Sequence, residues 1–175
     1  EMLKRKTYTL SPYNTFKVYE PKERIVMSNS YKDKVVQHAL CDNVLEPAFT
    51  KSFILDNYAS QTNKGTHFGL NRLREFMRSF YRTNDGWVLK CDISKYFYCI
   101  RHDILKQKVR KYITDANTLW LVYMIIDSTK DIGIPIGNQT SQLFALLYLN
   151  DLDHYIKEKL GIKYYGRYMD DFYLI

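Results

Sequence analysis

The feature that most constrains the fold is a pair of apolar runs around a tight acidic centre near the end of the chain. The runs are Ile162–Tyr168 and Phe172–Ile175, and the centre is Met169-Asp170-Asp171. Two β-prone runs this close together predict an antiparallel hairpin with acid at its tip. Adjacent aspartates repel one another, yet an acid pair in an exposed turn is common. The aspartate pair therefore indicates a functional site only if other acidic residues lie near it.

A third aspartate supplies that context. Asp92 lies in the apolar stretch Trp87–Ile93, which predicts a buried strand. A solvated face would not need a carboxylate at the end of such a strand. Two strand-end acid sites in one small domain can converge on a divalent cation, and hard oxygen ligands favour Mg²⁺ or Mn²⁺. Two such ions can activate an attacking oxygen and stabilise a leaving one in phosphoryl transfer.

The remaining helices and strands are predicted from the spacing of apolar residues and from the Gly and Pro residues that interrupt it. Residues 12–28 predict two antiparallel strands joined by a short charged turn at Pro21, and Thr66–Tyr81 predicts a helix. A helix from Lys32 to Leu45 is expected to end at Pro47. Further helices are expected at 104–113, 119–126 and 141–160, the last closed by Gly161, with a loop at 133–137.

Composition narrows the classes of partner. The 175 residues carry 26 Lys and Arg against 19 Asp and Glu, and this net charge of +7 suits a polyanion. No apolar run approaches the roughly 18–20 residues of a membrane span. Three cysteines without a CxxC pair disfavour a disulfide framework or a structural zinc site. The chain starts without methionine and ends inside a predicted strand, so we expect a fragment of a longer protein.

Several motifs together carry a family resemblance. Tyr168-Met169-Asp170-Asp171 resembles the Tyr-x-Asp-Asp box of reverse transcriptases, and Cys91–Phe97 resembles their first carboxylate motif. Gly133–Gln142, followed by Asn150, is similar to the loop and helix that precede the box. Glu20–Ile25 resembles the fingers hairpin, and Ser60–His67 a bacterial segment before a fingers helix. The resemblance covers nearly the whole chain in the family's order.

The resemblance implies an α+β fold, namely the fingers and palm of a right-hand polymerase with the thumb absent. A small antiparallel sheet backed by helices would form the palm. We expect fingers at residues 1–86 and palm at 87–175, with a loop at 131–142 at their junction. The implied activity is that of an RNA-directed DNA polymerase, which adds dNTPs to a primer 3′-hydroxyl.

The resemblance also assigns roles at the reacting centre. Asp92, Asp170 and Asp171 would be the catalytic carboxylates and would hold two Mg²⁺ ions, with Mn²⁺ as the alternative. The backbone carbonyl of Ile93 would be a further metal ligand. Phe97 matches the aromatic gate that excludes a 2′-hydroxyl from the incoming sugar.

Other residues would bind the substrates. For the dNTP, Lys22 and Arg24 would grip the triphosphate and Ile136 and Gly137 would lie close to the nucleotide. For nucleic acid, the resemblance points to Tyr168 and Met169, together with Lys64, His67 and Arg167. Arg167 has two interpretations, a primer contact or an ion pair with a surface acid. Asp151 and Asp153 are expected to be solvated.

The loop departs from the family pattern. Many reverse transcriptases have Gln-Gly where this chain has Ile136-Gly137, and Ser-Pro where it has Ser141-Gln142. That form resembles enzymes of diversity-generating retroelements and of bacterial group II introns. In the first group the substitution accompanies relaxed fidelity, which is consistent with the loss of an amide donor near the nucleotide.

The resemblance therefore predicts a bacterial, cytoplasmic retroelement enzyme that acts on an RNA template and a DNA or RNA primer, away from membranes. Two other roles stay open. One is a maturase that binds intron RNA as a splicing cofactor, and the other is a defence-associated polymerase that makes untemplated or protein-primed DNA. Oligomeric state, a homodimer included, is left open as well.

Overall fold

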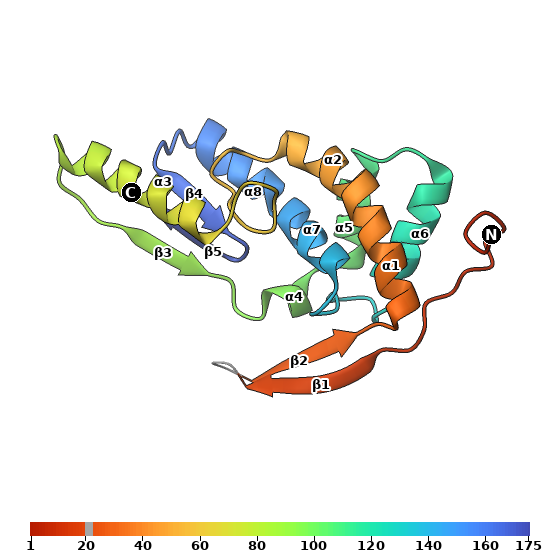
Figure 1. Ribbon diagram of the computed structural model, residues 1–175. Helices are drawn as coiled ribbons and strands as arrows, with labels where there is room; N and C mark the ends of the chain where they lie inside the picture. The colour runs from red at the N-terminus through yellow and green to blue at the C-terminus, as the bar shows by residue number, and fades with distance from the viewer. Residues whose placement is uncertain (20–22) are drawn as a thin grey trace. The chain divides into compact units, whose positions relative to one another are not determined.

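The structure, a computed structural model, describes residues 1–19 and 23–175 (Figure 1). These residues form two compact units, and each unit combines two stretches of chain. The first unit comprises Glu1–Ala48 and Phe97–Ser141, and the second comprises Phe49–Tyr96 and Gln142–Ile175. Helices and small antiparallel sheets alternate along the chain, so the predicted α+β class is confirmed. The proposed boundary at 86/87 is a separate matter and stays a prediction.

A two-stranded hairpin lies in the first unit. β1 (Asn14–Tyr19) pairs antiparallel with β2 (Glu23–Ser28), in a register that runs from Asn14 opposite Ser28 to Tyr19 opposite Glu23 (Figure 1). The two strands expected within 12–28 are thus confirmed. The turn at Pro21 and the candidate triphosphate ligand Lys22 lie outside the described residues.

The helix after this hairpin has a local start signal. α1 (Tyr31–Leu40) begins after Ser30, whose hydroxyl accepts a hydrogen bond from the Asp33 backbone amide. The Ser30 hydroxyl in turn donates to the Asp33 carboxylate at 2.7 Å. The first bond satisfies one backbone donor, the Asp33 amide, that the first helical turn leaves unpaired, and the second holds the two side chains together.

The expectation that Pro47 ends this helix is wrong. After α1 the chain continues through a π-helical turn (Cys41–Leu45) into α2 (Glu46–Phe49) and a 3₁₀ turn (Thr50–Ser52). Pro47 lies in α2, directly after the π-helical turn, in which the Glu46 amide donates to the Cys41 carbonyl. The wider π-helical turn replaces the regular i→i−4 ladder just before the proline, and the helical path continues past it.

Three further helices and a loop complete the first unit. They are α4 (Tyr96–Cys99), α5 (His102–Arg110) and α6 (Ala116–Ile126), and Asp115 caps α6 by accepting from the Thr118 amide at 2.7 Å. The loop at 133–137 leads into α7 (Gln139–Tyr148). The core of this unit is aliphatic and includes Leu45, Ile100, Leu105, Val109, Val122, Ile125 and Ile126.

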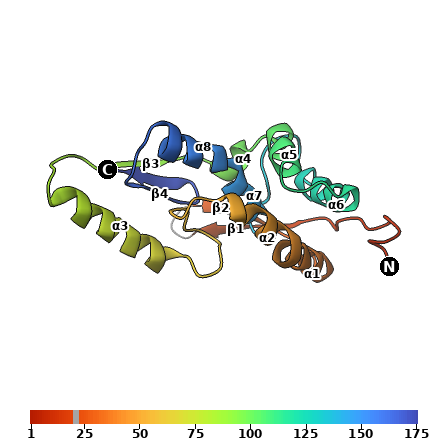
Figure 2. The same cartoon turned by 90° about the horizontal axis from the view of Figure 1, so that it is seen from above.

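The second unit is built around a three-stranded antiparallel sheet. Its strands are β3 (Leu89–Asp92), β4 (Tyr165–Tyr168) and β5 (Asp171–Leu174), in the order β3-β5-β4. The predicted hairpin with acid at its tip is therefore present. α3 (Thr66–Tyr81), which has the predicted bounds, and α8 (Asn150–His154) lie on opposite sides of this sheet (Figure 2).

β3 differs from the buried strand expected over Trp87–Ile93. It is shorter, and the side chains of Trp87 and Leu89 are 93% and 58% exposed. β3 lies at the edge of the sheet and pairs with β5 alone. Within the part of the chain that the structure describes, nothing covers its outer side, so the apolar composition of this segment does not lead to burial.

The long helix expected at 141–160 is interrupted. α7 ends at Tyr148, α8 begins at Asn150, and a π-helical turn (Tyr155–Lys159) follows. Gly161 then adopts φ +67° and ends the helical path, as predicted. No helix among the described residues is both long and apolar enough to cross a bilayer.

Candidate active site

Strand register brings the candidate carboxylates to one end of the sheet. Asp92 on β3 lies directly opposite Asp171 on β5, and Tyr168 on β4 is the other neighbour of Asp171. Residues directly opposite one another in an antiparallel pair point to the same face. Asp170 lies in the two-residue turn beside Asp171. The three-stranded sheet thus places the carboxylates of Asp92 and Asp171 on one face, and the hairpin turn carries Asp170.

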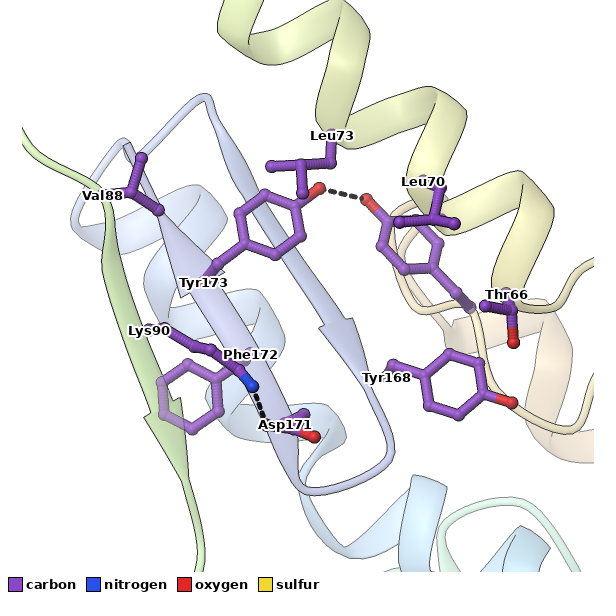
Figure 3. Close-up of a pocket in the computed structure, with 11 residues that line it drawn as sticks. Thr66, Leu70, Leu73, Val88, Lys90, Tyr168, Asp171, Phe172 and Tyr173 are labelled. Atoms are coloured by element: carbon purple, nitrogen blue, oxygen red, sulfur yellow. Dashed lines mark hydrogen bonds and ion pairs between the residues drawn. The ribbon is translucent and has the colours of Figure 1, made fainter.

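A lysine offsets part of this negative charge. Lys90 Nζ lies 3.2 Å from Asp171 Oδ1, and Lys90 shares the face of Asp92 two residues further along β3 (Figure 3). Like charges directly opposite one another destabilise a strand pair. Because Lys90 and Asp171 are both well exposed, the ion pair contributes little to stability.

The donor set suits Mg²⁺ but does not form a closed cage. Among the described residues, no three His, Cys, Asp or Glu side chains are grouped closely enough to hold a metal ion. Mg²⁺ rarely needs such a cage, because it binds one or two carboxylates and completes its shell with water and substrate phosphates. The facing carboxylates of Asp92 and Asp171 meet that requirement, whereas metal binding by all three aspartates stays a prediction.

Arg167 lies in the core, which corrects its assignment to nucleic acid. Its side chain is fully buried, and its Nε and Nη2 lie 2.7 and 2.5 Å from the two carboxylate oxygens of Asp153. Asp153 was expected to be solvated and is fully buried as well. Sequence spacing gives no signal for this pair, because the two residues lie 14 positions apart in different elements.

The sequence also did not predict a second polar network, which lies on the α3 side of the sheet. The Tyr58 hydroxyl hydrogen bonds with the Tyr173 hydroxyl at 2.9 Å and donates to Asp56 Oδ1 at 3.2 Å. Asp56 also pairs with Arg72 and Lys157. Burial raises the pKa of Tyr58 far above its usual range, so this hydroxyl stays protonated. The network links β5 to the loop before α3.

An apolar cavity adjoins the carboxylate face. It encloses about 270 Å³ between α3 and the sheet, and Leu70, Leu73 and Val88 form much of its wall (Figure 3). Tyr168 and the Lys90–Asp171 pair also line it. Of the candidate acids, Asp171 therefore borders a largely apolar surface on one side.

Lys64 has a structural task in this unit. Its ammonium group donates to the backbone carbonyls of Ile54, Leu55 and Asn57 at 3.4, 2.9 and 2.9 Å. An ammonium group has three N–H donors, so none is left for a phosphate. The expected nucleic-acid contact of Lys64 is corrected on this ground. His67 is exposed in the first turn of α3, and its role stays a prediction.

The candidate nucleotide-binding residues belong to the first unit. The Ile136 carbonyl accepts a hydrogen bond from the Met27 amide at 2.8 Å, which ties the loop to β2. Gly137 has φ +124°, and a Cβ there would lie 2.9 Å from the Met27 carbonyl oxygen. The close approach that this glycine permits is therefore to β2. Arg24 on the same strand is exposed.

Phe97 is connected to the same loop. It lies in α4, and its carbonyl accepts from the Ile134 amide at 2.8 Å. Its role as the sugar gate stays a prediction, because the aspartates belong to the other unit and the structure describes the two units separately.

Comparison with known proteins identifies the family. The sequence pattern of the family described as reverse transcriptase (RNA-dependent DNA polymerase) matches residues 17–175. The chain belongs to the reverse transcriptase family. The predicted family is thereby confirmed, and the match extends from β1 to the last described strand.

Individual relatives of this reverse transcriptase domain agree with that assignment. Protein YkfC of Escherichia coli K12 is 26% identical over an aligned length of 161 residues, and the match covers 85% of this chain and 42% of YkfC. Two yeast proteins, the putative COX1/OXI3 intron 1 and intron 2 proteins of Saccharomyces cerevisiae, are 19% and 23% identical over 78% and 73% of this chain. The chain spans less than half of YkfC and about a sixth of the yeast proteins.

A solved structure shows the same fold. Telomerase from Candida albicans, determined in complex with a fragment of telomeric RNA, matches 98% of this chain and 39% of its own length with a TM-score of 0.68. At 11% identity the similarity concerns the fold alone. It supports the predicted fingers and palm architecture of the reverse transcriptase domain.

Proposed function

We propose that this chain forms the fingers and palm of an RNA-directed DNA polymerase that extends a primer 3′-hydroxyl with dNTPs. The observation that carries the proposal is the strand register that sets Asp92 opposite Asp171 next to the turn with Asp170. In a member of the reverse transcriptase family, acids collected at a hairpin tip suit phosphoryl transfer by metal ions. The boundary between fingers and palm at 86/87 is part of the proposal.

Two Mg²⁺ ions would be held by the carboxylates of Asp92, Asp170 and Asp171 and by the Ile93 carbonyl. Bound there, the ions would favour deprotonation of the primer hydroxyl and stabilise the pyrophosphate leaving group. The chain's own contribution is to fix the acids on rigid strands. Tyr168 and Met169, at the same tip, would contact the primer end, and His67 would contact the nucleic-acid backbone.

The first unit would supply the nucleotide contacts. Arg24 is exposed on β2, where a guanidinium can bind a triphosphate through charge-assisted hydrogen bonds, and Lys22 would assist it. Phe97 would exclude ribonucleotides by contact with the 2′-hydroxyl. The loop at Ile136 and Gly137 would form one side of the nucleotide site. The RNA template is proposed from the family and from the RNA-bound telomerase fold.

The decisive experiment removes single carboxylates without changing shape. Asp92→Asn and Asp170→Asn should each reduce primer extension on an RNA template by at least about 100-fold, since even indirect metal partners are worth 10–100-fold. Asp85→Asn, which alters an exposed acid in the turn after α3, is the matched control and should extend primers normally. Circular dichroism should show the same fold for all three variants. Normal extension by Asp170→Asn would overturn the proposal.

A second role is supported by the names of two relatives. Both yeast proteins are described as intron proteins, and the net charge of +7 suits a large RNA. We propose a group II intron or a related bacterial retroelement as the source, with splicing assistance as an additional activity. The intact protein carrying Asp170→Asn should still promote splicing of its intron RNA. Loss of splicing together with loss of DNA synthesis would contradict a separate binding role.

A further inference from the structure

We propose that Arg167 is a positioning residue for the catalytic turn. Its buried guanidinium, held by Asp153, fixes the Met169 carbonyl and so sets the direction in which Asp170 is presented. The catalytic consequence rests on the proposed polymerase function, whereas the anchoring of the turn does not.

The first step is a fork between two fully buried side chains. Arg167 Nε and Nη2 donate to Asp153 Oδ1 and Oδ2 at 2.7 and 2.5 Å, which is a side-on bidentate contact. Bidentate pairs fix orientation as well as distance. Asp153 is itself held on α8, where its Oδ1 accepts a bond from the Tyr165 hydroxyl at 2.6 Å. The guanidinium plane therefore has a fixed direction.

The second step is the reach of the remaining nitrogen. With Nε and Nη2 on Asp153, Arg167 Nη1 donates to the Met169 carbonyl at 2.6 Å. Nη2 also donates to the Leu146 carbonyl on α7, at 3.2 Å. A lysine has a single ammonium group on a flexible stem. It cannot donate to both carboxylate oxygens of Asp153 and to the Met169 carbonyl at the same time in this geometry. The position requires arginine.

The third step is the conformation of the turn. Met169 has φ +58°, in the left-handed region that residues with side chains rarely adopt. Its carbonyl belongs to the peptide group that leads directly into Asp170. A hydrogen bond to that carbonyl holds the left-handed conformation in place. Without it, rotation of this peptide would move Asp170 relative to Asp171.

The base of the hairpin is fixed by separate contacts. The Arg167 amide donates to the Asp56 carbonyl and the Arg167 carbonyl accepts from the Tyr58 amide, both at 2.9 Å. β4 pairs with β5 along its other edge. The strand register therefore has contacts of its own that do not involve the guanidinium, whereas the Met169 carbonyl in the turn is held by the side chain.

The test must separate positioning from stability. Replacing a buried ion pair by apolar residues of similar size is often neutral for stability, but here the Tyr165 hydroxyl also loses its acceptor, so the double variant Arg167→Met/Asp153→Leu should stay folded with a moderately lower melting temperature. Its kcat per folded molecule should fall by about 10-fold to 100-fold with little change in the KM for dNTP, as expected when a positioning contact is lost. Activity is measured on the intact protein.

Two readouts do not depend on catalysis. Hydrogen exchange of the Asp170 and Asp171 amides should become faster in the double variant, while exchange of the Tyr165 amide is unchanged. Mn²⁺ binding, followed by the electron paramagnetic resonance of the free ion, should weaken several-fold. If the parent does not extend primers, the polymerase proposal fails, but exchange of the turn amides still decides whether Arg167 anchors the turn.

The chain contains a second Arg–Asp pair that can serve as a control. Arg101→Lys alters a second side-on fork, with Asp103, that is exposed and lies in the first unit, so it should change none of the readouts. If the double variant does not fold, Arg167→Lys keeps the charge and is expected to show the same loss of kcat and faster turn exchange. Parental kcat and parental turn exchange, in whichever of these variants folds, would overturn the proposal.

Discussion

At the scale of single residues, burial separates the acids by role. Asp33, Asp56 and Asp153 are almost fully buried, and each accepts at least two hydrogen bonds from side chains. Asp92 is exposed, and Asp171 is about half exposed. Buried carboxylates with a full set of donors stabilise the fold, whereas exposed ones remain accessible to ligands.

Asp33 gives the fold a dependence on acid. Burial alone would raise the pKa of Asp33, but hydrogen bonds from Tyr8, Ser30 and Ser11 outweigh it and lower the pKa. A depressed folded pKa means that ionised Asp33 stabilises the fold above the unfolded pKa, and that this contribution is lost as pH falls through the folded pKa. Urea denaturation of the parent should therefore show a steep loss of stability below about pH 4.

Asp33→Asn should be less stable than the parent at pH 6 and should lose less stability between pH 6 and pH 3. Asp85→Asn, at an exposed position, is the matched comparison and should follow the parent curve. Parallel curves for Asp33→Asn and the parent would show that Asp33 does not carry the acid dependence.

At the scale of elements, the loop at 133–137 is held by its backbone. The bond from the Met27 amide to the Ile136 carbonyl and the fit of Gly137 against β2 do not involve the Ile136 side chain. That side chain is half-buried and can be exchanged without loss of these contacts. The backbone geometry of the loop is therefore independent of the chemical group at position 136.

Ile136→Gln should lower misincorporation during DNA synthesis. The side-chain amide would add a hydrogen-bonding group beside the proposed nucleotide site, and such groups enforce the geometry of the correct substrate. Sequencing of the products from parent and variant on one RNA template measures the error frequency. Ile136→Leu, which changes shape but adds no donor, is the control. Equal error spectra for parent and Ile136→Gln would remove the link between this position and fidelity.

Elements with local signals were predictable from the sequence, and contacts between distant segments were not. α3 has its predicted bounds because Gly65 and Asn84-Asp85-Gly86 flank an amphipathic run, and the β4–β5 hairpin follows from its spacing. The exposure of β3 depends on its edge position, which composition does not encode. The Arg167–Asp153 pair and the three carbonyls around Lys64 likewise arise only when the chain folds.

Family motifs carried the site prediction further than physical pattern alone. The residues themselves predicted a hairpin with acid at its tip and a strand-end acid, Asp92, that could converge with it on a cation, and the resemblance assigned the three aspartates their catalytic roles. The strand register is consistent with that grouping. Neither the residue pattern nor the family resemblance predicted that Arg167 is buried. Buried and exposed residues both occur beside the Tyr-x-Asp-Asp motif, so position in the sequence does not separate them.

At the scale of the whole molecule, an excess of basic residues is the main physical signal. Lys and Arg exceed Asp and Glu in both compact units, for a total net charge of +7. Such a charge favours binding to phosphate backbones and makes that binding sensitive to salt, because each neutralised phosphate releases counterions. The charge is thus relevant to substrate binding even though the candidate active site itself is acidic.

RNA affinity should fall by at least about 10-fold between 50 and 200 mM salt, as expected when several phosphates are neutralised. Fluorescence anisotropy with an Asp170→Asn variant measures binding without DNA synthesis. A morpholino of the same base sequence has an uncharged backbone and should show almost no salt dependence. Equal salt dependence for both oligomers would mean that the basic excess does not bind the RNA backbone.

The left-handed conformation of Met169 also bears on how the Tyr-x-Asp-Asp box can vary in evolution. At its second position φ +58° penalises branching at Cβ. Unbranched residues satisfy this backbone restriction at smaller cost, and glycine relieves the torsion altogether. The torsion therefore selects the kind of side chain at this position without involving either neighbouring aspartate.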